Sequence, residues 1–232
     1  MEKRFFEITG KLNAWNYAIS MRNATECVRT GYHLAKLLLE KRKINLQEIV
    51  LNKSLSSEEH VCFPPGDTVQ IGNEEYSIHL LLQMCAQSVF QNAHSFFDYL
   101  AQCINCIFVD TPLSEANVSF HRVEAKCNNP TIKEFMKGIE EDSKYKLICD
   151  YNNKTKHYHM LDLTLYFAVD DYTVSAKTAK FTKPTKDGEH TYSQYDFIEL
   201  IKDTYELLYR SFNDIEAFIN CEFRRERIEE KS

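Results

Sequence analysis

The chain is short of glycine and proline, and this scarcity favours helices over turn-rich β structure. Its 232 residues include only six glycines and five prolines. A β-sandwich or barrel needs a turn roughly every 8–12 residues, and tight turns depend on these two residue types. The composition therefore predicts a mainly α-helical protein.

Long apolar runs are also missing. Polar residues interrupt every apolar stretch before it reaches the roughly 20 residues of a membrane-spanning helix, and residues 1–6 contain no apolar signal-peptide core. We therefore expect a cytoplasmic protein without membrane segments. The chain carries 34 acidic and 28 basic side chains, a formal net charge of −6. This charge does not attract nucleic acid, although a local basic patch could.

The eight cysteines are scattered and do not form a metal motif. Cys103 and Cys106 form the chain's one CxxC motif, whereas a zinc site of this type needs a second pair. A redox CxxC opens a helix after a strand, but this one lies late in a helical pattern. We interpret the cysteines as reduced packing residues, and we expect no metal and no other cofactor.

Apolar residues at helical spacing predict four or five helices, near residues 12–43, 77–109, 130–139, 143–157 and 193–219. In the first helix, the candidate core positions are Trp15, Ile19, Leu34, Leu37 and Leu38. Period-two alternation and turn residues predict two small hairpins, at residues 68–76 and 161–181. We expect a single domain over residues 1–232, with a surface excursion at residues 44–75 and a hairpin insertion at residues 160–182.

Capping residues set the expected helix starts. Ser77 caps the second helix, and Pro130 takes the first position of the third after two asparagines. Asp142 or Ser143 caps the fourth helix. The last is capped by one of two hydroxyl residues, Thr191 or Ser193.

The second predicted helix has an unusual polar face. Between residues 77 and 109, Asp98 is the only charged side chain. The face opposite the apolar stripe carries Gln83, Gln87, Gln91, His94, Asp98, Gln102 and Asn105. A solvated face normally carries Lys and Glu. The neutral stripe therefore indicates either a central bundle helix or a helix that lines a groove or dimer interface.

The fourth predicted helix ends in a dense polar run, Asn152-Asn153-Lys154-Thr155-Lys156-His157. Following the neutral-polar helix, this run resembles the motif of the HEPN superfamily (higher eukaryote and prokaryote nucleotide-binding domains), in particular its divergent bacterial members. The resemblance covers roughly residues 77–159. It implies a HEPN-like four- to five-helix bundle and a homodimer that brings two motifs together.

The resemblance also implies a function. Many family members are metal-independent ribonucleases of toxin–antitoxin or defence systems, with RNA as substrate and an antitoxin protein as partner. Their motif has an arginine, a polar residue, a short spacer and a histidine. His157 matches the histidine and Asn153 the polar residue, but Asn152 stands where the family has arginine. Lys154 and Lys156 would contact substrate.

Further substrate-binding candidates, from the neutral stripe, are Gln91, His94 and Asp98. Cleavage through the RNA 2′-hydroxyl needs a proton carrier, which histidine provides with its ordinary pKa of about 6.5. It also needs positive charge beside the phosphorane, which a guanidinium supplies and an asparagine does not. Whether the chain is an enzyme is therefore open, and a catalytically silent helical interaction or dimerisation module is the alternative.

Other interpretations of the same residues also stay open. The lysines and His157 could simply favour the dipole at a helix C-terminus. His157 and His159 could bind a metal, but they offer only two ligands. A helical enzyme that uses the amide stripe as a small-ligand pocket lacks any Gly-rich loop or nucleophile motif.

Overall fold

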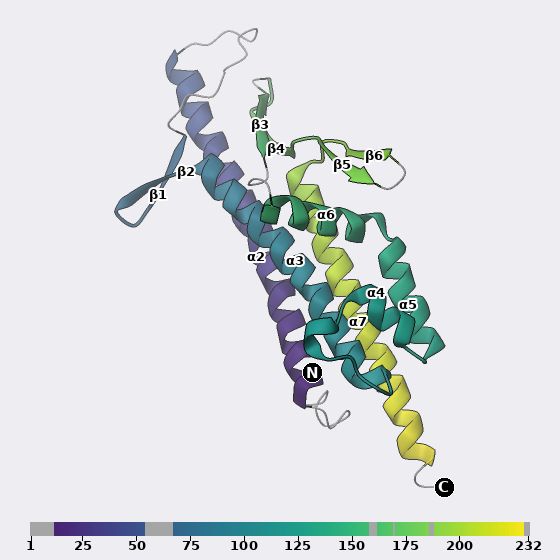
Figure 1. The fold of residues 1–232 in the computed structure, drawn as a ribbon. Coiled ribbons are helices and arrows are strands. Elements are labelled where there is room, and N and C mark those ends of the chain that lie inside the picture. Colours follow the sequence, from purple (N-terminus) through teal and green to yellow (C-terminus); the bar gives the residue numbers. More distant parts are fainter. Residues whose placement is uncertain (1–11, 54–66, 158–161, 169, 186–187, 230–232) are drawn as a thin grey trace. The chain divides into compact units, whose positions relative to one another are not determined.

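The computed structural model describes residues 12–53, 67–157, 162–168, 170–185 and 188–229. It is mainly helical with small antiparallel hairpins, as predicted (Figure 1). The helices are α2 (Leu12–Lys53), α3 (Ile78–Phe108), the short 3-10 helix η1 (Glu115–Asn117), α4 (Phe120–Lys126), α5 (Pro130–Glu141), α6 (Ser143–His157) and α7 (Phe197–Glu229). The strands are β1 (Thr68–Ile71), β2 (Glu74–Ser77), β3 (Leu163–Ala168), β4 (Thr173–Thr178), β5 (Phe181–Thr185) and β6 (Gly188–Tyr192).

The chain divides into two compact units. One comprises the described parts of Met1–Val28, Phe90–Cys149 and Asp203–Ser232, and the other Arg29–Val89 and Asp150–Lys202. We call them the first and second units. Helices α2, α3, α6 and α7 run from one unit into the other. The single domain expected over residues 1–232 stays a prediction.

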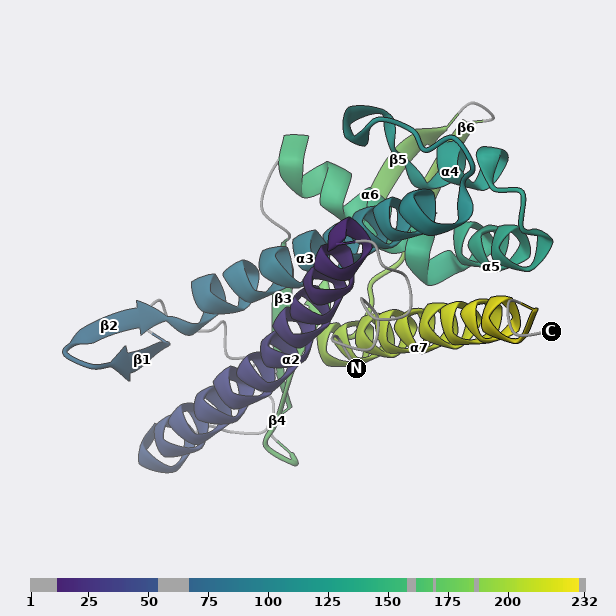
Figure 2. The ribbon, with the colours of Figure 1, turned by 90° about the horizontal axis from the view of Figure 1, so that it is seen from below.

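Aromatic side chains fill the core of the first unit. The rings of Phe97, Phe120 and Tyr145 pack edge-on or tilted, with centroids 4.8–6.3 Å apart. Phe135 on α5 contacts Phe218 on α7 at 5.4 Å. Figure 2 shows α5 beside this later part of α7. Helices η1 and α4, which lie between α3 and α5, were not predicted.

The expected caps are confirmed at three helices and wrong at a fourth. The Asn129 side chain accepts from the backbone N–H groups of Thr131 and Ile132, just before Pro130. Asp142 caps α6 by accepting from the Lys144 N–H at 2.8 Å. Ser77 caps α3, which starts directly after it, and its Oγ accepts from the Leu80 N–H at 3.4 Å.

The last helix begins later than predicted. Asp196, not Thr191 or Ser193, caps α7 by accepting from the N–H groups of Ile198 and Glu199 at 3.0 and 3.1 Å. The reason is that Thr191 belongs to β6, so the chain is still extended there.

The first helix is longer than predicted and buries a different face. It ends at Lys53 rather than near Lys43, so residues 44–53 of the expected excursion are helical. Contacts in the second unit account for the extension: Leu46 is buried, and Asn45 Nδ2 donates to the Thr68 carbonyl at 3.2 Å. Residues 54–66 lie outside the described part.

Small residues dominate the buried face of α2. Leu38 is buried and Trp15 and Ile19 are half-buried, but Leu34 and Leu37 are 43% and 67% exposed. The buried positions of the helix include Ala14, Ala18, Met21, Ala24, Val28, Ala35 and Leu38. A Cβ on Gly31 would lie only 2.5 Å from Val89 Cγ2 of α3. The two backbones thus approach closely along small residues, which leaves those two leucines outside.

The two predicted hairpins are confirmed. Strands β1 and β2 join through Gly72, whose φ of 65° suits a two-residue turn. Strands β3 and β4 pair from Leu163↔Thr178 to Ala168↔Thr173, within the expected residues 161–181. In the turn, Asp171 Oδ1 accepts from the backbone N–H of Thr173 at 3.0 Å.

A third hairpin, β5–β6, was missed. Gly188 opens β6, which pairs with β5 from Phe181↔Tyr192 to Thr185↔Gly188. Pro184 argues against a strand at β5 when only the sequence is considered, because a proline cannot donate a hydrogen bond to a strand ladder and is tolerated only at a sheet edge. The hairpin region therefore extends past the predicted residues 160–182, to Tyr192.

Candidate functional site

The predicted motif occupies the second half of α6, in the second unit. Asn153 and Lys156 are exposed and Lys154 is half-buried. His157 is the last residue of the helix, but its side chain lies outside the described part, as does His159. The exposed motif residues are thus available to a ligand.

Asn152, at the position of the family arginine, points into the protein. Its side chain is 1% exposed, and among the described residues neither Nδ2 nor Oδ1 has a hydrogen-bond partner. Burying an unpaired amide costs about 1–3 kcal/mol per lost hydrogen bond. In this conformation Asn152 does not reach solvent, whereas its neighbour Asn153 does.

A buried carboxylate organises the region just before the motif. Asp150, 9% exposed, forms an ion pair with Lys183 of β5 and accepts a 2.6 Å hydrogen bond from the Tyr192 hydroxyl of β6. Both carboxylate oxygens are therefore engaged. The missed hairpin is fixed to α6 by a charge-assisted pair and a strong hydrogen bond.

Stacked aromatic rings form the base of this contact. The rings of Phe181 and Tyr192, cross-strand partners, stack with centroids 4.6 Å apart. Tyr151 of α6 packs on Phe181 at 4.8 Å, and burial raises the pKa of Tyr151 to about 12. These rings act as core rather than as an open stacking platform.

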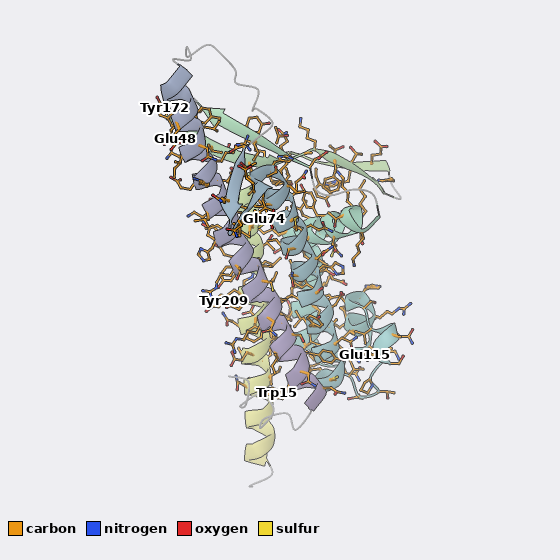
Figure 3. The ribbon with its side chains drawn as sticks, turned by 90° about the vertical axis from the view of Figure 1, so that its left-hand side faces the viewer. Trp15, Glu48, Glu74, Glu115, Tyr172 and Tyr209 are labelled. Atoms are coloured by element: carbon orange, nitrogen blue, oxygen red, sulfur yellow. The ribbon has the colours of Figure 1, made fainter. Side chains whose placement is uncertain are left out.

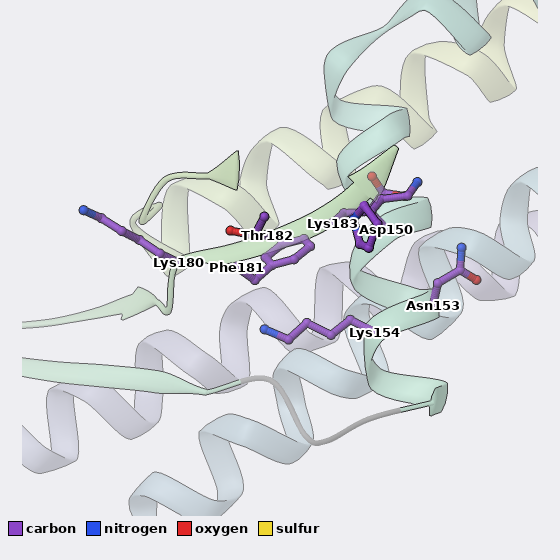
Figure 4. Close-up of a pocket in the computed structure, with 8 residues that line it drawn as sticks. Asp150, Asn153, Lys154, Lys180, Phe181, Thr182 and Lys183 are labelled. Atoms are coloured by element: carbon purple, nitrogen blue, oxygen red, sulfur yellow. The ribbon is translucent and has the colours of Figure 1, made fainter. Parts of the chain in front are cut away.

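A cavity of about 740 Å³ lies against this contact. It is lined by Asp150, Asn153, Lys154, Lys180, Phe181, Thr182, Lys183 and Pro184. We call it the lysine pocket. Figure 4 shows Lys154 extending along the Phe181 ring, Lys183 next to Asp150, and Lys180 directed away from both. Lys154 Nζ is 4.7 Å from the Phe181 ring centroid, within range of a cation–π interaction.

The β5–β6 hairpin places a histidine beside these groups. Lys183 and His190 are cross-strand partners, so both project from the face that carries Phe181 and Tyr192. The His190 ring packs edge-on against Tyr192 at 4.5 Å. Lys180, Lys183 and His190 were not predicted from the sequence, because Pro184 interrupts the strand that carries Lys183 and so hides the hairpin from pattern analysis.

The other predicted substrate-binding residues lie in the first unit. Gln91 and His94 are half-buried, and His94 Nδ1 is 3.1 Å from Asp98 Oδ2, one helical turn further on. The motif belongs to the second unit, and the structure describes each unit by itself. The groove that would unite the two sets of residues stays a prediction.

The last residues of the neutral stripe line a second cavity, of about 560 Å³, in the first unit. Asn105 accepts from the Leu113 N–H at 2.8 Å and donates to its carbonyl at 3.0 Å. Tyr17 donates to Glu115 Oε1 at 3.1 Å, and burial together with Glu115 raises its pKa to about 12 (Glu115 is labelled in Figure 3). Asn105 at least has a structural role, holding the chain after α3.

The CxxC cysteines fit a packing role. Cys103 is fully buried, and burial raises the pKa of its thiol, which opposes formation of a reactive thiolate. Cys103 and Cys106 are both thiols that are not joined in a disulfide. Within the described residues, no helix combines the length and apolarity needed to cross a membrane.

Comparisons with known proteins give no match: no family model, no curated protein and no solved structure is significantly similar to this chain.

Proposed function

We propose that this protein is a HEPN-like RNA-binding protein that holds the RNA backbone at the lysine pocket. The observation that carries the proposal is the gathering of Lys154, Lys180 and Lys183 around one cavity, in a chain whose net charge is −6. The pocket directly adjoins the motif, because Asn153 and Lys154 belong to both.

The charges of the pocket favour an anion. Three ammonium groups and the single carboxylate of Asp150 give it a net charge of +2. Asp150 already neutralises Lys183, so Lys154 and Lys180 carry the available charge. The Asn153 amide and the Thr182 hydroxyl add hydrogen-bonding groups for phosphate oxygens.

The ring of Phe181 is only 8% exposed, so bases cannot stack on it freely. Binding through lysines to phosphates is insensitive to base sequence and weakens steeply with salt. We therefore propose backbone-dominated, sequence-tolerant RNA binding, with a Kd of roughly 1–100 µM at physiological salt.

We propose that any cleavage is metal-independent and uses His157 to transfer protons, as the HEPN resemblance implies. With asparagine in place of arginine, nothing in the motif supplies a bidentate positive charge to the phosphorane. Loss of such a stabilising group typically slows a reaction by about 10²–10³-fold. Toxin–antitoxin or defence activity, with an antitoxin partner, belongs to this proposal.

A catalytically silent module is the second candidate, and the burial of Asn152 favours it. A residue that is 1% exposed cannot contact a substrate phosphate without a rearrangement of α6. Under either candidate we propose a homodimer, which the exposed apolar side chains of α2 support, among them Leu37 at 67% exposure. Light scattering would test the dimer, and Leu37→Glu would weaken it if this face is used.

The binding test uses a fluorescent single-stranded RNA of about 12 nucleotides and mixed sequence. Lys154→Gln and Lys180→Gln should each weaken binding about three- to fivefold and lower the salt slope by roughly 0.7. The matched controls are Lys126→Gln and Lys133→Gln, which make the same charge change at exposed lysines of the first unit. The proposal fails if wild type does not bind, or if pocket and control variants bind equally.

The cleavage test incubates RNA with excess wild-type protein in EDTA and analyses the products for 2′,3′-cyclic phosphate ends. Such ends, lost in His157→Ala, would establish the ribonuclease. Intact RNA together with normal RNA binding would establish the silent alternative.

A further inference from the structure

A separate cluster of ligand-type side chains lies in the first unit, between α4 and α5. His121 and Glu124 are three residues apart on α4 and so project from one face of that helix. Glu140 comes from the last turn of α5. One donor atom from each of the three residues lies within 4.8 Å of the other two.

The cluster has an excess of negative charge. Glu124 and Glu140 are both half-buried, and half-buried like charges at this spacing repel each other. Across the described residues, neither carboxylate pairs with a lysine or arginine. His121 Nδ1 lies 3.8 Å from Glu140 Oε2, and it forms an ion pair there only when the imidazole is protonated. A bound cation would remove this repulsion.

We propose that His121, Glu124 and Glu140 bind one divalent transition-metal ion, with zinc as the best fit. One imidazole and two carboxylates are donors that Zn²⁺ accepts, and three protein ligands leave a coordination position for water. Metal–ligand bonds of about 2.0–2.2 Å require the donors to lie closer together than 3.8 Å. His121 can close this gap by rotating, because its side chain is 80% exposed.

A metal at this place was not predicted from the sequence. The three ligands are dispersed over residues 121–140 in no known motif, and only the packing of α4 on α5 brings them together. The site does not depend on the proposed RNA binding, since no residue of the lysine pocket takes part. The metal would link α4 to α5 and stabilise the first unit.

The test titrates the full-length, metal-free chain with Co²⁺, followed by absorption spectroscopy, and with Zn²⁺, followed by calorimetry. We expect one ion per chain with weak d–d bands, as nitrogen and oxygen ligands give. The thiols of Cys27 and Cys221 are exposed, and binding there would instead give intense thiolate charge-transfer bands. The spectrum therefore separates the proposed site from adventitious cysteine sites.

Ligand variants complete the test. His121→Ala and Glu140→Gln should each weaken Zn²⁺ binding at least about tenfold. Glu141→Gln, an exposed neighbour on the same helix, should bind as wild type does. If His121→Ala fails to fold by circular dichroism, Glu124→Gln replaces it. Thiolate bands, absence of binding at millimolar metal, or equal binding by ligand and control variants would each overturn the proposal.

Discussion

Replacing Asp150 with asparagine should destabilise the protein while strengthening its binding of anions. The substitution removes the charge that Lys183 pairs with and weakens the 2.6 Å hydrogen bond from Tyr192. A hydrogen bond to a charged group contributes about 1.5–3 kcal/mol. The asparagine oxygen can still accept from one donor, and Lys183, 46% exposed, regains hydration. We therefore expect a loss of about 2 kcal/mol, below the roughly 3–5 kcal/mol typical of breaking a fully buried ion pair.

The gain in anion binding follows from the released lysine. Removing one negative charge about 6 Å from a bound phosphate is worth roughly 0.7 kcal/mol even at the dielectric constant of bulk water, which is about threefold in affinity. The salt slope for single-stranded RNA should rise by roughly 0.7, because one more lysine contacts phosphate. Thermal unfolding, with a Tm about 4–8 °C lower, and RNA titration at several salt concentrations measure the two effects.

Tyr192→Phe provides the matched control. It removes one hydrogen bond from Asp150 but leaves the ion pair with Lys183 intact, so we expect a similar loss of stability and unchanged RNA affinity. A folded Asp150→Asn variant that binds RNA no better than wild type would contradict this prediction. Equal strengthening in Tyr192→Phe would also refute it, because the effect would then come from loosening of the hairpin.

The remaining predictions concern packing and buried charge, and denaturant unfolding measures all of them. Gly31→Ala should destabilise the protein by about 1–3 kcal/mol through overpacking. Gly138→Ala, with open space around the new Cβ, should instead stabilise it by up to about 1 kcal/mol. Equal effects of the two substitutions would contradict the close approach of Gly31 to α3. Asp67→Asn should cost about 3 kcal/mol, since it removes the carboxylate that pairs with buried Arg42 at 2.7 Å. Unchanged stability would contradict this prediction. Asn152→Arg should lower the free energy of unfolding by several kcal/mol, because it buries a charge, and it should not restore RNA cleavage. A stable variant that cleaves RNA would show that the side chain at position 152 can reach solvent.

Much of the fold could be predicted because its signals are local. The Asn129-Pro130 start of α5, the Gly72 turn and the alternation of β3 each depend on neighbours in the sequence. The errors come from contacts between distant residues. The ion pair of Arg42 with Asp67 and the burial of Leu46 support the helix beyond its predicted end.

The candidate site could be predicted only in part, for the same reason. The motif identified Asn153 and Lys154, which do line a cavity, because they lie next to each other on one helix. Lys180 and Lys183 line that cavity from the start of the β5–β6 hairpin. No local sequence pattern predicts the pairing of this hairpin, because Pro184 interrupts β5. The pocket depends on Asp150 contacting residues more than 30 positions away.

The position of Asn152 shows what helical spacing adds to motif matching. It follows Ile148, which is 1% exposed, by four residues, and side chains four apart share a helix face. The apolar face of α6 therefore extends to Asn152, whereas Asn153, two residues after buried Tyr151, turns outward. An arginine at this position would need a buried counter-charge, and among the described residues no group hydrogen-bonds to the side chain that stands there. Burying a neutral asparagine there costs less free energy than burying a charged arginine. The packing of α6 therefore explains the asparagine at position 152 as directly as a loss of catalysis would.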